Sequence, residues 1–133
     1  MDRLAFHETS NNGLSFELLV NGKPLCEMIG GEEGGIPYWL FEDNLPHYPP
    51  FGLSQDRTRR IVCVCECGEY GCGHTSCRLV EDNGVVTLCE FSGVVSPSEE
   101  RRSFTFEAGH FQEVVAEMVR RAKKRNIGKV IHL

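Results

Sequence analysis

The residues with the most distinctive chemistry in this 133-residue chain are its cysteines. Five of the seven cysteines fall within 15 residues, and a histidine lies among them. The members of this run are Cys63, Cys65, Cys67, Cys72, His74 and Cys77. Thiolates and imidazoles bind zinc, exchange disulfides and act as nucleophile and base, so the run could carry metal, redox or catalytic chemistry.

Glycines in the middle of this run predict a turn between two antiparallel strands. If residues 68–71 form the loop, Cys67 lies opposite Cys72, and Cys65 lies opposite His74. Side chains alternate along a strand, so these four side chains would share one face. The other face is predicted to be the core face, and it carries Val62, Val64, Cys77 and Leu79.

Three thiolates and one imidazole form a known closed zinc site, which makes Cys65, Cys67, Cys72 and His74 the predicted metal ligands. Four ligands on a flat ladder form a rectangle of roughly 5 by 7 Å, so a tetrahedral site would need a bulge or a strong twist. The spacing also differs from the usual zinc knuckle, which has two residues between cysteines. Two alternatives stay open: reduced cysteines without metal, and a reversible disulfide between Cys67 and Cys72.

A catalytic interpretation of the same run is weaker. Cys65 and His74 on adjacent strands could form a nucleophile and its base. The sequence has none of the motifs of serine hydrolases, zinc peptidases, dinucleotide-binding folds or phosphate loops. The sequence therefore favours a protein without enzymatic activity, and no catalytic residue is assigned.

The first eight residues lack the basic and then apolar pattern of a secretory signal. A cytoplasmic location follows as the expectation, and thiols stay reduced in that compartment. Cys26 and Cys89 are each expected to lie alone on a strand as small core residues. No apolar run approaches the length of about 18 residues that a membrane span needs, so a transmembrane protein is not expected.

The run Cys65-Glu-Cys67-Gly-Glu-Tyr-Gly-Cys72-Gly, which follows an apolar strand, resembles a segment of small uncharacterised bacterial proteins that form a domain of unknown function. The resemblance covers residues 61–80. It implies a bacterial, cytoplasmic, single-domain protein, and it transfers no functional residue to this chain.

Hydrophobic patterning predicts an α+β fold. Two Asn-Gly pairs, at 21–22 and 83–84, are typical of tight hairpin turns. We predict one antiparallel sheet of five or six strands and one C-terminal helix, in a single domain of residues 1–133. The predicted elements are a hairpin at 14–29 with Leu18 opposite Leu25, a meander at 60–91, a strand at 101–107 and a helix at 109–125 with Val115 and Met118 in the core.

Prolines break regular structure between residues 36 and 53, yet this stretch is rich in aromatic residues. One interpretation is a long loop whose aromatic side chains pack over a sheet edge. The other is a contact surface for a protein partner, because exposed aromatic residues mark binding sites. The predicted partner-binding residues are Tyr38, Trp39, Phe41, Tyr48 and Phe51.

The formal net charge is −5, which opposes binding to nucleic acid or to an anionic membrane. Basic residues nevertheless crowd the end of the predicted helix, at 120–125. They could simply interact favourably with the negative end of the helix dipole on a solvated face. The alternative is a binding site for an acidic partner.

From these observations we predict a small cytoplasmic, non-enzymatic binding or interaction protein. The alternative is a thiol-based redox switch or a zinc-linked switch centred on Cys65, Cys67, Cys72 and His74.

Overall fold

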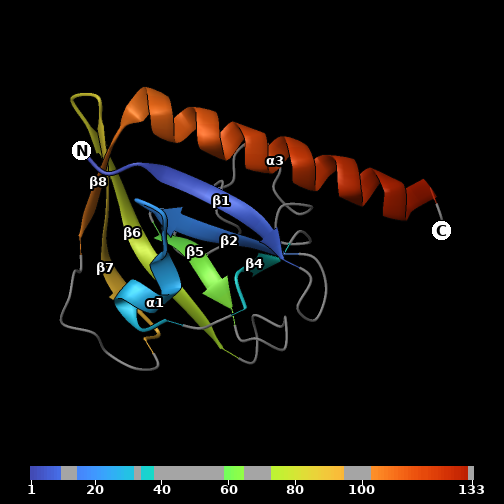
Figure 1. The fold of residues 1–133 in the computed structure, drawn as a ribbon, viewed down its shortest axis with the longest axis horizontal. Helices are drawn as coiled ribbons and strands as arrows, with labels where there is room; N and C mark the ends of the chain where they lie inside the picture. Colours follow the sequence, from blue (N-terminus) through green and yellow to red (C-terminus); the bar gives the residue numbers. More distant parts are fainter. Residues whose placement is uncertain (10–14, 32–33, 38–58, 65–72, 95–102, 132–133) are drawn as a thin grey trace.

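The fold is known from a computed structural model, which describes residues 1–9, 15–31, 34–37, 59–64, 73–94 and 103–131; the side chains of the last helix are described as far as Ala122. The architecture is α+β, as predicted (Figure 1). The prediction of one sheet was wrong, because the strands form two separate antiparallel sheets.

The first sheet is built around β2, Ser15–Val20. On one side β2 pairs with β1, Leu4–Thr9, a strand that the sequence analysis missed. On the other side it pairs with two short strands, β3 at Lys23–Pro24 and β4 at Ile36–Pro37. The predicted Asn21-Gly22 turn is confirmed, since φ is 53° at Asn21 and 85° at Gly22.

The second arm of the predicted hairpin ends early. Its pairing stops at Leu19 and Pro24, and the chain turns into the short helix α1, Leu25–Ile29. The predicted pairing of Leu18 with Leu25 is therefore wrong, although both side chains are buried. A physical reason lies in the flanking residues: Pro24 precedes α1, and Gly30 ends it in the left-handed conformation with φ 69°.

The second sheet is a four-stranded meander in the order β5-β6-β7-β8. Its strands are β5 at Arg59–Val64, β6 at His74–Asp82, β7 at Val85–Ser92 and β8 at Phe104–Glu107. The turn between β6 and β7 is the predicted Asn-Gly pair, with positive φ at both residues. The predicted meander is thus confirmed, and the last predicted strand is shorter than expected.

Two irregularities bend this sheet. The register between β5 and β6 shifts between Ile61 and Cys63, and as a result Ile61, Val62, Cys63 and Val64 are all buried. The register between β6 and β7 shifts next to Glu90, which adopts φ 51°. Arg59 donates to the carbonyl oxygen of Glu90 over 2.8 Å and so holds this unusual backbone in place.

The two sheets touch at two junctions. On one side, the Gly34 amide donates to the Val64 carbonyl over 2.7 Å, and the Val64 amide donates to the Gly35 carbonyl over 2.8 Å. On the other side, the Asp2 amide donates to the Thr105 carbonyl over 2.8 Å, and a carboxylate oxygen of Asp2 accepts from the Thr105 amide over 3.1 Å. Gly34 and Gly35 are both buried, and both form hydrogen bonds with β5.

The long helix α3, Ala108–Ile131, follows β8 without a loop and packs across β1, β7 and β8. Val115 and Met118 are buried, as predicted, with Met118 fully inaccessible. The helix joins residues of both sheets and of α1 in one hydrophobic cluster. It also continues past Asn126 and Gly128, where the sequence predicted its end.

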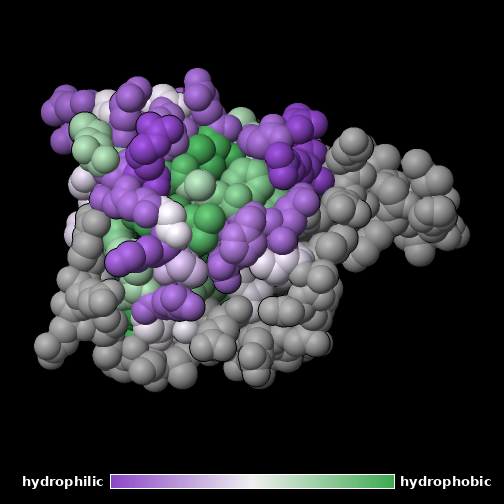
Figure 2. All heavy atoms as spheres, viewed as in Figure 1, coloured by the Kyte–Doolittle hydropathy of each residue, from purple (hydrophilic) through white to green (hydrophobic). Residues whose placement is uncertain are grey.

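Figure 1 shows that α3 extends beyond both sheets toward the C terminus. A helix of 24 residues is about 36 Å long, and its first half is the part that lies over the sheets. On the face seen in Figure 2, hydrophobic residues gather in the centre and hydrophilic residues surround them. On the outward face of the first sheet, Ala5 lies opposite Leu19, and Leu19 lies opposite Pro24.

Candidate functional site

Most of the predicted site residues fall outside the described part of the chain. This holds for the three predicted cysteine ligands, Cys65, Cys67 and Cys72, and for the predicted Cys67–Cys72 disulfide. It also holds for the five aromatic residues between 38 and 51. Among the residues that the structure does describe, no three His, Cys, Asp or Glu side chains are grouped closely enough to hold a metal ion.

His74 is the one predicted ligand that the structure places. It begins β6, is exposed, and lies opposite Val64 rather than Cys65. The predicted register was therefore wrong, and Cys77 lies opposite Arg60. The pairing is offset by one residue already at His74, and the bulge between Ile61 and Cys63 adds a second residue of offset by Cys77.

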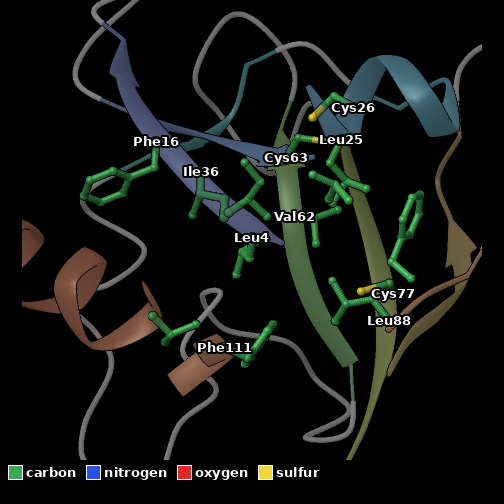
Figure 3. Packing of buried hydrophobic residues seen from close by; sticks show 14 of the residues in the cluster. Leu4, Phe16, Leu25, Cys26, Ile36, Val62, Cys63, Cys77, Leu88 and Phe111 are labelled. Carbon is green, nitrogen blue, oxygen red and sulfur yellow. The ribbon is translucent and has the colours of Figure 1, made fainter. Parts of the chain in front are cut away.

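The structure brings together two other cysteines that the sequence analysis did not connect. Cys26 comes from α1 and Cys63 comes from β5, and the two sulfur atoms lie side by side (Figure 3). Cys26 is 6% exposed and Cys63 is 0% exposed. The expectation that Cys26 lies alone on a strand was wrong, since it lies on a helix and its thiol shares a hydrogen bond with Cys63.

The Cys26 thiol is held in its neutral form. The hydrogen bond with Cys63 raises its pKa well above the ordinary value, and burial adds to this effect. Because the thiolate is the reactive form of cysteine, Cys26 is a slow nucleophile at neutral pH. The pair therefore reacts slowly at neutral pH and is poorly suited to rapid catalysis.

Gly31 lies next to both members of this thiol pair. Its amide donates to the Cys26 carbonyl over 2.8 Å, which ties the end of α1 to the following chain. A Cβ atom on Gly31 would lie 3.2 Å from the Cys63 sulfur and 3.0 Å from the Thr75 hydroxyl oxygen. A side chain at this position would therefore force the Thr75 and Cys63 side chains to shift by a few tenths of an ångström.

The remaining described cysteines lie in the second sheet and have different roles. Cys77 on β6 is fully buried, and this burial raises its pKa to about 12. Cys89 on β7 is half-buried, and both cysteines are free thiols. The expectation that Cys89 is a strand residue is confirmed. Cys77 behaves as a small core residue and is chemically inert at neutral pH.

Charged residues form a second distinctive arrangement, on α3. Glu117 accepts hydrogen bonds from Arg120 and from Arg121, and these bonds lower its pKa to about 2. The Arg121 guanidinium also lies over the Phe6 ring, 5.2 Å from the centroid, and 4.0 Å from the carboxylate of Glu8. Arg121 thus anchors α3 to β1.

From Met118 onward, a stretch that includes this anchor, all charged residues of the sequence are basic. From Met118 to the end of the sequence there are six basic residues and no acidic one. Before Met118 there are eight basic and 19 acidic residues, a net formal charge of −11. The part of α3 that extends past the sheets is therefore positive, and the rest of the chain is negative.

The comparisons with known proteins add no relative: no family model, curated protein or solved structure matches this chain. In the described part of the chain, no helix combines the length and the apolar character needed to cross a bilayer.

Proposed function

We propose that this chain is a small, non-enzymatic interaction protein of the cytoplasm, and that the C-terminal end of α3 binds an acidic surface of a protein partner. The observation that carries the proposal is the separation of charge. The stretch from Met118 onward contains six basic residues, whereas the rest of the chain has a net formal charge of −11. They belong to the part of the chain that includes the extended end of α3 (Figure 1).

The first two basic residues of this end are engaged within the chain. Arg120 pairs with Glu117, and Arg121 contacts Glu117, Glu8 and Phe6. Four further basic residues follow the last acidic residue of the sequence: Lys123, Lys124, Arg125 and Lys129. With no acidic residue after Glu117, a partner of opposite charge is the natural complement to these four.

A protein partner is favoured over nucleic acid for an electrostatic reason. A polyanion that approaches the end of α3 also meets the field of an acidic body, which repels an extended chain of phosphates. A compact acidic surface can contact the helix end without reaching the rest of the chain. The aromatic segment at 38–51 is a second predicted contact surface, and its residues lie outside the described part.

The test uses a fluorescently labelled glutamate-rich peptide and a labelled DNA duplex, each titrated with the full chain. We expect the peptide to bind, with an affinity that falls as salt is added. Tighter binding of the duplex would overturn the choice of partner.

A charge-neutral variant then locates the site. Replacing Lys123, Lys124 and Arg125 by Gln should weaken peptide binding about tenfold, because each exposed ion pair contributes about 0.5 kcal/mol and 1.4 kcal/mol is a factor of ten. The matched control replaces three basic residues elsewhere: Arg3, Lys23 and Arg78. An equal loss in both variants would show a response to net charge alone and would refute the proposed site.

A further inference from the structure

We infer that Cys26 and Cys63 are a modification site at which a peroxide forms a reversible disulfide, and that this bond ties α1 to β5. The two residues are 37 positions apart in the sequence, yet their side chains meet in the fold (Figure 3). Each comes from a defined element, so their approach does not depend on a loose loop.

The packing around the pair favours this bond over other pairings. Among the described cysteines, Cys26 is the one whose thiol shares a hydrogen bond with Cys63. Gly31 lies against the Cys63 sulfur, where a Cβ atom would be at 3.2 Å, and Thr75 lies beside the same position. The Thr75 hydroxyl is itself held by the Gly93 carbonyl at 2.9 Å, so this side of the pair is fixed.

The reaction consumes one peroxide and two thiols. Cys26 is the more exposed residue of the two, and its sulfur attacks a peroxide oxygen, the O–O bond breaks, and a sulfenic acid and water form. The Cys63 sulfur then attacks the sulfur of the sulfenic acid, the S–O bond breaks, and the second water leaves. The two thiols lose two electrons and two protons in total, and the peroxide is reduced to two molecules of water. A dithiol reductant reverses the bond by exchange.

The disulfide would stabilise the fold. It would link α1, which lies between two strands of the first sheet, to the first strand of the second sheet, and the two joined positions are 37 residues apart in the sequence. A cross-link of this span restricts the unfolded chain and leaves the folded packing in place. We therefore expect the oxidised protein to unfold at a higher temperature than the reduced protein.

The experiment must separate Cys63 from its neighbours in the sequence. No Lys or Arg occurs between Arg60 and Arg78, so trypsin alone leaves five cysteines on one peptide. Digestion with trypsin and a glutamate-specific protease yields peptides 61–66 and 18–27. In a Cys65→Ser background these two peptides carry Cys63 and Cys26 as their only cysteines.

The Cys65→Ser chain is treated with hydrogen peroxide, raised in steps until Cys89 is oxidised, and then alkylated in denaturant. We expect peptides 18–27 and 61–66 to be joined, and the thermal midpoint to rise and return to its starting value with dithiothreitol. Adding Cys89→Ser should preserve the joined peptides. Adding Cys26→Ser should abolish them together with the rise in midpoint.

Two results would overturn the inference. One is complete alkylation of Cys26 and Cys63 at a peroxide concentration that oxidises Cys89. The other is Cys63 joined to a cysteine other than Cys26. If the Cys26→Ser chain fails to fold, the test rests on the Cys89→Ser chain. In that chain, peroxide must join peptides 18–27 and 61–66, and dithiothreitol must separate them again.

Discussion

The Arg121 guanidinium of α3 lies over the Phe6 ring of β1, 5.2 Å from its centroid. Phe6 in turn meets Phe16 of β2 edge to face, with 5.2 Å between the ring centroids. This chain of contacts connects the helix to two strands of the first sheet. It marks the boundary between the part of α3 that belongs to the core and the part that we propose binds a partner.

Arg121→Ala should lower the free energy of unfolding by about 0.5–1 kcal/mol, because it removes the cation–π contact with Phe6. Arg120→Ala is the matched control, since Arg120 pairs with Glu117 within the helix. Chemical denaturation of both variants measures the difference. Equal effects would mean that Arg121 does not anchor the helix to β1.

Gly93 and Gly84 share the same φ of 77° but have different surroundings. A Cβ atom on Gly93 would lie 2.1 Å from the His74 carbonyl oxygen, whereas Gly84 has nothing within 4 Å. Gly84→Ala should therefore cost the strain of the left-handed backbone alone, about 1–2 kcal/mol. Gly93→Ala should cost about 2–5 kcal/mol, because overpacking is added. Similar melting temperatures for the two variants would contradict this packing.

Glu90 is a non-glycine residue in the left-handed region, where an ordinary side chain costs about 1–2 kcal/mol. Glu90→Gly removes that strain and loses an exposed pair with Arg78. Since glycine also gains freedom in the unfolded chain, we expect a net stabilisation of about 0.5 kcal/mol. Glu81→Gly, in a regular part of β6, should destabilise by about 1 kcal/mol. Destabilisation by both substitutions would argue against strain at Glu90.

The pairing of Glu117 with Arg120 and Arg121 makes a pH-dependent contribution to stability. The pKa of Glu117 is lowered from 4.5 to about 2 in the folded protein. The contribution is therefore complete above pH 4.5 and is lost as the pH falls toward 2. Titration of the Glu117 carboxyl by NMR should show the low pKa, and Arg120→Gln should raise it. A midpoint near 4.5 in the parent protein would rule out the two hydrogen bonds.

Local signals in the sequence predicted much of the second sheet and of α3. The two Asn-Gly turns were placed correctly because both positions need positive φ and asparagine and glycine tolerate it. The buried face of α3, including Met118, followed from its helical spacing. These features depend on residues close together in the chain, which is why patterns could reveal them.

Longer-range features could not be found in this way. The division into two sheets depends on contacts such as that of Gly34 with Val64, which no periodicity encodes. The helix α1 has five residues, too few for a helical period, although Pro24 before it and Gly30 after it were usable signals. Cys26 on α1 and Cys63 on β5 are 37 positions apart in the sequence, and no local pattern connects them.

The most direct test of the proposed interaction is amide hydrogen exchange of the full chain, with and without the glutamate-rich peptide. We expect added protection in α3 from Met118 onward and no change in the β6–β7 hairpin, which serves as the internal control. Protection confined to residues 38–51 would assign binding to the aromatic segment instead. That result, or exchange that the peptide leaves unchanged throughout α3, would contradict the account.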